Sequence, residues 1–166
     1  VIRNAASMEM TGIELELMYQ VTEAWDLMVT YGYLEAEYKD YLADLTGDGV
    51  ITDNSGLIPR NTPENTFGFT TSYTAQLGNG ELKGRVSYRF RDEMNTDSSN
   101  NPLGDLDSIE NVNATLSYSV DNYSITLWGR NLTDEREQRW ATIGGLTSRG
   151  WWNEPSTVGV TFNVSY

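Results

Sequence analysis

Two residue types are missing altogether from this 166-residue sequence, which contains no cysteine and no histidine. Without cysteine the chain can form neither a disulfide framework nor a thiolate site. Without histidine it lacks the commonest general base and metal ligand. Glu135 and Glu137 form an acidic pair, but no nucleophile motif accompanies them. We interpret such pairs as solvated surface charge and expect no enzymatic activity.

Basic side chains are scarce as well. Eleven lysines and arginines stand against 24 acidic residues, which gives a net charge of −13. Proteins bind DNA and RNA through clustered lysines and arginines that neutralise phosphates. We therefore expect no nucleic-acid partner.

Long apolar runs are also absent. No segment approaches the roughly 18 apolar residues that a membrane helix needs, and no basic segment followed by an apolar stretch opens the sequence as a signal peptide would. The mean hydropathy is −0.48. This low value excludes membrane-spanning helices. It does not exclude membrane-spanning strands, because a transmembrane β-barrel places only one face of each strand in lipid. Ten tyrosines and five tryptophans would suit the aromatic girdles of a barrel or a carbohydrate-binding sandwich.

Alternation of apolar and polar side chains is what the sequence does contain. In the clearest segment, residues 82–90, Val86 and Tyr88 fall on one side and Arg85 and Arg89 on the other, a period of two that no helix would give. The same pattern predicts seven strands, over residues 8–20, 27–33, 67–73, 82–90, 112–118, 123–127 and 157–166.

The connections between these strands alternate in length. Tight turns are predicted at residues 20–24, 77–80 and 120–122, and long polar loops at 40–61, 92–105 and 133–153. All tight turns then lie at one end of an up-and-down sheet and all long loops at the other, as in outer-membrane barrels. We expect an all-β, antiparallel, up-and-down transmembrane β-barrel segment of about seven strands, which is part of a larger barrel or closes as a small one.

The last ten residues carry a more specific pattern. A polar residue, a glycine, two apolar residues and a final aromatic recur at fixed spacing in a strand with one apolar face. This ending resembles the assembly signal of outer-membrane β-barrels and implies the outer-membrane assembly machinery as a partner. The residues that carry the resemblance are Gly159, Phe162, Val164 and Tyr166.

Residues 127–135 resemble the penultimate-strand signature of TonB-dependent outer-membrane receptors. Segments 11–16, 58–63 and 155–159 also resemble family motifs, in the family's order, although Ser156 stands where the family often has arginine. The signature residues are Gly129, Asn131, Leu132 and Asp134.

The resemblance implies that residues 1–166 are the C-terminal part of such a receptor barrel, without its plug domain and signal peptide. The complete protein would lie in the outer membrane of a Gram-negative bacterium and import a scarce nutrient, such as a metal chelate, vitamin or glycan. Its implied partners are the lipid bilayer, the remainder of the barrel and plug, a small-molecule substrate, and TonB through the missing N-terminal part. The alternative is a self-contained small β-barrel or soluble β-sheet protein with a structural or carbohydrate-binding role.

One loop resembles the beginning of a calcium-binding loop. Asp44, Thr46 and Asp48 would supply oxygens at positions one, three and five, and Val50 its carbonyl at position seven. The acidic ligand expected at position twelve is replaced by Ser55. Calcium is therefore possible here and no other cofactor is expected; the alternative is a surface loop rich in glycine and aspartate.

Charged side chains are predicted on the wet faces of three strands. In a barrel they would face the lumen, where they could hold a plug, guide an anionic substrate or pair with one another. These residues are Glu14, Glu16, Lys83, Arg85, Arg89, Arg91 and Arg130. Their apolar neighbours, such as Leu15, Val29 and Val160, are predicted to face lipid. Trp140, Trp151 and Trp152 would contact a ligand or partner, pack the loop or lie at the membrane interface.

Overall fold

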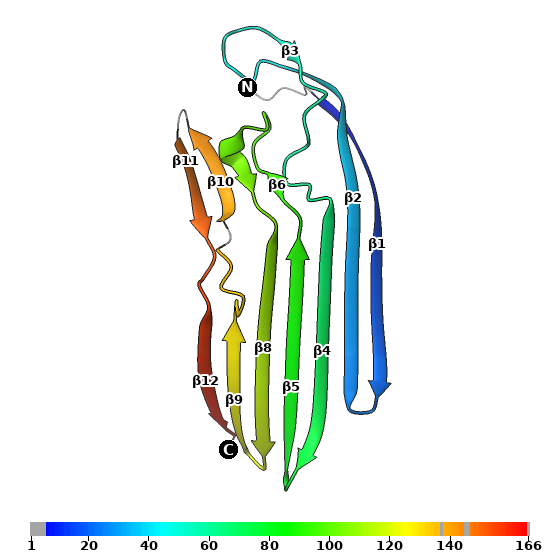
Figure 1. The fold of residues 1–166 in the computed structure, drawn as a ribbon, viewed down its shortest axis with the longest axis vertical. Coiled ribbons are helices and arrows are strands. Elements are labelled where there is room, and N and C mark those ends of the chain that lie inside the picture. Colours follow the sequence, from blue (N-terminus) through cyan, green and yellow to red (C-terminus); the bar gives the residue numbers. More distant parts are fainter. Residues whose placement is uncertain (1–5, 137, 145–146, 166) are drawn as a thin grey trace.

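Seven long strands form one antiparallel sheet whose order follows the chain (Figure 1). The computed structural model describes residues 6–136, 138–144 and 147–165. The strands of the sheet are β1 (Ala6–Thr22), β2 (Trp25–Ala43), β4 (Asn65–Leu77), β5 (Gly80–Arg91), β8 (Ile109–Val120), β9 (Tyr123–Arg130) and β12 (Thr157–Val164). The seven strands and the up-and-down order predicted from the alternation are confirmed.

Tight turns join the strands at the lower end of Figure 1 and long connections join them at the upper end. The long connections contain short elements that the alternation did not predict. They are β3 (Thr52–Asp53), which pairs with the end of β2; β6 (Met94–Asn95), which pairs with β7 (Asp105–Leu106); the single turn η1 (Pro102–Gly104); and the hairpin of β10 (Gln138–Gly144) and β11 (Thr147–Trp152). No helix in the described ranges is long and apolar enough to span a membrane.

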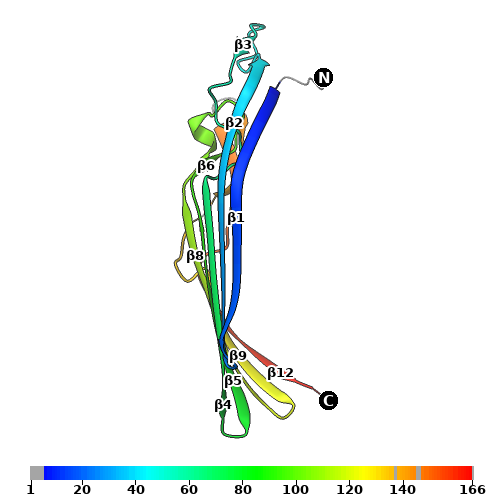
Figure 2. The same cartoon turned by 90° about the vertical axis from the view of Figure 1, so that its right-hand side faces the viewer.

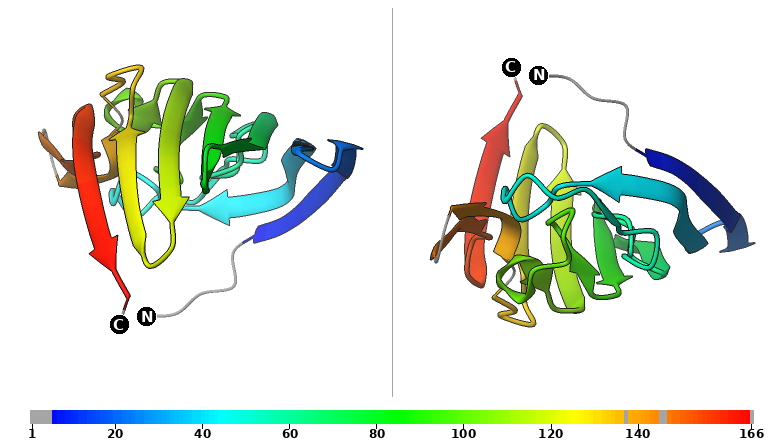
Figure 3. Two further views of the ribbon diagram at one scale, coloured as in Figure 1. Left: turned by 90° about the horizontal axis from the view of Figure 1, so that it is seen from below. Right: turned by 90° about the horizontal axis from the view of Figure 1, so that it is seen from above.

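The sheet is a single layer with two open edges. Figure 2 shows it nearly edge-on, and in Figure 3, along the strands, it follows an arc. β1 pairs only with β2, and β12 only with β9, within the described residues. The sheet therefore does not close as a small barrel, which removes one of the two forms that the sequence left open.

Strand register gives the sheet one apolar and one polar face. Residues paired across an antiparallel ladder point to the same side, so the partners of one strand extend its pattern to the next. Val29 on β2 lies between Leu17 and Phe69, and Leu116 on β8 lies between Gly84 and Leu127. The apolar face includes Ile13, Leu15, Leu17, Leu27, Val29, Val86, Tyr88, Leu116, Leu127, Val160, Phe162 and Val164.

Almost nothing in this sheet is buried by the chain itself. In the described part of the chain the buried hydrophobic side chains are Tyr41, Leu106 and Ile109, all toward the long-loop end. On the apolar face Leu15 is 61% exposed and Val160 62%. A sheet normally buries its apolar face against another layer. Here something outside this chain must cover it.

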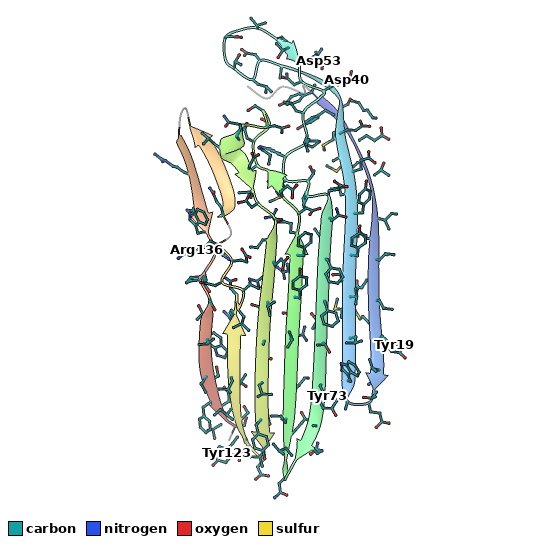
Figure 4. The ribbon with its side chains drawn as sticks, viewed as in Figure 1. Tyr19, Asp40, Asp53, Tyr73, Tyr123 and Arg136 are labelled. Carbon is teal, nitrogen blue, oxygen red and sulfur yellow. The ribbon has the colours of Figure 1, made fainter. Side chains whose placement is uncertain are left out.

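Aromatic side chains mark the short-turn end of the apolar face. Tyr19, Tyr73 and Tyr123 lie toward the lower ends of β1, β4 and β9 in Figure 4, and Trp25 pairs with Tyr73. Rings in a band at one height are typical of the girdle that barrels place at a membrane–water interface.

Candidate functional site

The seven charged residues predicted for the wet faces of the strands all lie on the polar face of the sheet. On β5, Lys83, Arg85, Arg89 and Arg91 alternate with the apolar set, and their cross-strand neighbours are mostly small or neutral polar residues. Arg89, for example, lies between Gly68 and Asn111.

The seven predicted charges do not form one cluster. Glu14 and Glu16 lie on β1, which β2 and β4 separate from β5. No ion pair joins two of the seven within the described residues. The ion pairs seen there both involve Lys39, which contacts Glu9 at 3.2 Å and also Glu37. Five of the seven, the four β5 cations and Arg130, lie on strands that only β8 separates.

A cavity of about 650 Å³ lies at the loop end of the polar face. Three arginines from two strands line it, with amide side chains between them. Arg91 donates to the carbonyl oxygens of Asp92 at 2.6 Å and Asp107 at 3.1 Å, while Arg130 lies 5.3 Å from the centre of the Trp128 ring. Trp152 from the last long loop lines one side of the cavity. The structure does not describe the side chain of Trp140.

A second cavity, of about 620 Å³, has the opposite charge. Its acidic lining comes from β2, from the approach to β4 and from the loop between β5 and β8. The residues are Glu35, Glu64, Asp92, Glu93, Asp105 and Asp107. Sequence reasoning did not find it, because residues far apart in the chain form the wall and none belongs to a motif.

The signature run ties three strands together at the loop end of the sheet. Asn131, which is 5% exposed, donates from its side-chain amide to the carbonyls of Glu135 and Glu154, each at 3.0 Å. Its side-chain oxygen accepts from Asn111 on β8 at 3.1 Å, and its backbone N–H donates to the Asn113 side chain at 2.9 Å. One buried side chain therefore joins β8, the end of β9 and the segment that leads into β12.

The other signature residues support the same turn. Asp134 accepts a hydrogen bond from the backbone N–H of Ser156 at 2.9 Å, and the backbone N–H of Leu132 donates to the Val112 carbonyl at 2.8 Å. A Cβ on Gly129 would lie 2.6 Å from the Leu132 side chain. The motif recognised in the sequence is thus a structural clamp in this protein.

Gly159 has a steric role on the polar face. It pairs with Trp128, and a Cβ at this position would lie between 2.3 and 2.9 Å from three atoms of the indole ring. The Trp128 ring lies across the glycine and donates its N–H to Thr161 at 3.1 Å. Aromatic cover of a glycine on a neighbouring strand is a known way of stabilising a sheet.

Replacing Gly159 with alanine is therefore expected to destabilise the protein by about 1–3 kcal/mol, because the indole must move and give up its bond to Thr161. Denaturant unfolding of the complete protein measures the change. Gly84→Ala is the matched control, since the nearest atom to its added Cβ lies at 3.8 Å. Equal effects of the two substitutions would show that loss of glycine, and not the ring contact, sets the cost.

The remaining residues of the predicted assembly signal are partly described. Phe162 stacks on Tyr123 with ring centres 6.2 Å apart, and Val164 pairs with the same tyrosine. Tyr166 lies outside the described residues. The reading of this strand by an assembly machinery stays a prediction.

The loop predicted to bind calcium is held by its own backbone. The Asp44 carboxylate accepts from the N–H groups of Gly49 at 2.8 Å and Gly47 at 2.7 Å, and these bonds, that of Gly49 above all, keep the pKa of Asp44 below its usual value. Asp48 accepts from the N–H of Val50 at 2.8 Å. No group of three or more acidic side chains suited to a metal occurs among the residues that the structure describes.

We expect calcium to bind this loop no tighter than the millimolar range, because the carboxylate that completes such loops is missing at position twelve. Calorimetry on the complete protein, with Asp48→Ala as the comparison, measures the affinity. A submicromolar dissociation constant that Asp48→Ala abolishes would contradict this.

Comparisons with known proteins agree with this geometry. A family model described as "TonB dependent receptor-like, beta-barrel" matches residues 1–132. The ferric yersiniabactin uptake receptor FyuA from Yersinia pestis has a similar structure, with a TM-score of 0.83 and 18% identity over 98% of this chain and 24% of that one. The siderophore receptor PiuA from Acinetobacter baumannii is also similar, with a TM-score of 0.79 and 23% identity over 98% of this chain and 22% of that one.

At these identities the two structures show a shared fold. This chain spans about a quarter of the length of either receptor, which agrees with a partial barrel and an open sheet. The family model covers most of the chain. The chain therefore belongs to the TonB-dependent receptor β-barrel family.

Proposed function

We propose that the complete protein imports a scarce nutrient across the outer membrane of a Gram-negative bacterium with energy from the TonB system. One observation carries the proposal: a continuous apolar face opposes a continuous polar face over seven strands. A wall between lipid and a wet interior needs this arrangement. Family membership supports the coupling to TonB.

In this proposal the apolar face contacts lipid and the polar face lines the lumen, where it meets the plug and the substrate. The open edges of β1 and β12 pair with the rest of the barrel. An unpaired backbone group in hydrocarbon costs several kcal/mol, so neither edge can be left open inside a bilayer. The tight turns face the periplasm and the long loops the outside.

The nutrient is a metal chelate, a vitamin or a glycan. The two solved receptors are named for siderophores, which makes a ferric chelate the first substrate to test. We prefer this proposal to the alternative of a soluble carbohydrate-binding sheet, because the sheet has two open edges and an exposed apolar face that lipid would cover.

The test is uptake by the bacterium that carries the gene, measured with radiolabelled ferric chelate, cobalamin and maltodextrin. Deletion of the gene should abolish accumulation of one of the three, and the complete gene on a plasmid should restore it. A tonB deletion should abolish the same uptake. If the protein reaches the outer membrane and its loss alters none of the three, import of these nutrient classes is disproved.

A further inference from the structure

We propose that a gap in the sheet beside β2 binds an extended basic peptide from outside the cell as an additional strand. The gap lies at the long-loop end, where β2 continues beyond the start of β4. An extended peptide that adds to an open strand edge gains backbone hydrogen bonds along its length. The inference rests on the proposed function only in placing this end of the sheet outside the membrane.

Two backbone hydrogen bonds mark the ends of the gap. At its lower end the N–H of Leu34 donates to the Glu64 carbonyl at 2.9 Å, and at its upper end the N–H of Asn54 donates to the Tyr41 carbonyl at 2.7 Å. Between them β2 pairs with β1 on one side, and no described segment pairs with its residues 35–40 on the other. At about 3.3 Å per residue the gap is roughly 20 Å long.

Backbone groups of β2 point into this gap. In an antiparallel strand the N–H and C=O of one residue point to the same side, and those of the next residue to the opposite side. The N–H of Leu34 points toward β4, so the groups of Ala36 and Tyr38 point that way too. Ala36 also lines the acidic cavity of about 620 Å³. The cavity therefore contains a strand edge with which a peptide can pair.

The loop before β4 leaves the gap open because it is bonded elsewhere. The Asn100 side chain accepts from the N–H of Ile58 at 2.7 Å and donates to the Ile58 carbonyl at 2.8 Å. The N–H of Asn61 donates to the Asn95 carbonyl at 2.8 Å, and Figure 1 shows this part of the chain running toward β6. Residues 55–63 also include two prolines, which have no N–H to give to a neighbouring strand.

The charge of the cavity favours a basic peptide. Within the described residues six carboxylates and no lysine or arginine line it, and the six are Glu35, Glu64, Asp92, Glu93, Asp105 and Asp107. Arg91 donates to two carbonyls of this wall and offsets part of the charge. In an added strand, lysines or arginines at alternate positions lie on one side, where they can form charge-assisted hydrogen bonds with the carboxylates.

The test measures peptide binding to the complete protein in detergent, by calorimetry at physiological ionic strength. The probe is a short acetylated and amidated peptide of alternating lysine and valine. The matched control peptide has the same sequence with all its backbone nitrogens methylated, which removes the donors needed for strand pairing and keeps the charge. We expect the probe to bind and the methylated peptide to bind at least about tenfold more weakly.

Variants of the protein test the strand edge and the charge separately. Ala36→Pro removes an N–H that faces the gap and takes no part in pairing with β1, as an edge position allows, and it should weaken binding about tenfold or more. Glu35→Gln combined with Glu93→Gln should weaken binding severalfold. Glu23→Gln, in the tight turn at the other end of β2, is the matched control and should change the affinity less than about twofold.

Four results would overturn the inference. If the wild-type protein does not bind the probe, another part of the complete protein fills the gap or the carboxylates only keep other strands away from the edge. Equal binding of the methylated peptide, or an equal effect of Glu23→Gln and the Glu35 and Glu93 pair, would show diffuse attraction. Unchanged binding by a folded Ala36→Pro variant would exclude this edge.

The methylated peptide is tested on the wild-type protein, so it decides the matter even if Ala36→Pro does not fold. Nutrient uptake distinguishes the two proposals, because a protein that imports its nutrient and binds no peptide contradicts this inference alone.

Discussion

Val29→Arg is expected to lower the free energy of folding into a bilayer by about 2–4 kcal/mol, which is the range for an arginine on the lipid face near the midplane. Val29 lies on the apolar face of β2, between the paired aromatics Trp25 and Tyr73 at one end and Tyr33 at the other. The guanidinium would have to lose its water or distort the bilayer.

Met28→Arg is the matched control, because it introduces the same side chain one residue away on the polar face. Met28 lies opposite Met18, with Glu16 as a diagonal neighbour on β1 and Asp26 two residues away on β2 itself, so an arginine there lies near carboxylates and stays hydrated. We expect a cost below about 1 kcal/mol. Denaturant titration of the complete protein folded into phospholipid vesicles gives both values. Equal costs at the two positions would remove the assignment of the apolar face to lipid.

Asn131→Ala is expected to destabilise the protein by about 3 kcal/mol. The substitution leaves the carbonyls of Glu135 and Glu154 without their donor and the Asn111 amide without its acceptor, and a buried polar group without a partner costs about 1–3 kcal/mol. Asn131 also has a positive φ of 50°, a conformation that asparagine tolerates better than alanine.

Two further variants divide this effect into its parts. Asn131→Gly keeps the backbone conformation accessible and loses only the side-chain bonds, so its difference from Asn131→Ala measures the strain. Asn122→Ala removes one exposed amide bond, to the Ser165 carbonyl, and should cost less than about 1 kcal/mol. Denaturant unfolding measures all three. A loss at Asn131 no larger than at Asn122 would show that the clamp does not stabilise the sheet.

The long strands were predictable because each has an apolar face and a polar face. Successive residues of a strand point to opposite faces, so apolar and polar side chains alternate along the sequence. β5 shows it most plainly. The hairpin of β10 and β11 forms a separate two-stranded sheet, which does not continue the apolar and polar faces of the main sheet. Gln138–Gly144 therefore shows no clear alternation of apolar and polar residues. The two-residue strands β3, β6 and β7 are too short for any period.

The candidate sites divide along the same line. The wall charges on β5 were predictable because strand alternation alone decides their side. The cavities were not predictable, because their linings combine residues that are far apart in the sequence. Arg89 and Trp152 line one cavity, and Tyr33 and Asp107 the other, only because the long loops fold back toward the sheet. The signature run was recognised by resemblance, but nothing in the sequence revealed that Asn131 is buried and bonded to three segments.

The two open edges also predict how this chain behaves when it is produced by itself. β1 presents seventeen residues of strand, and β12 eight, with one side of the backbone ladder unpaired. β1 carries no proline within those seventeen residues, so nothing interrupts its outer ladder. Such edges recruit other strands, including those of identical chains. The 166-residue chain produced by itself would thus tend to associate edge to edge into insoluble material, and we expect a partner for both edges to prevent this.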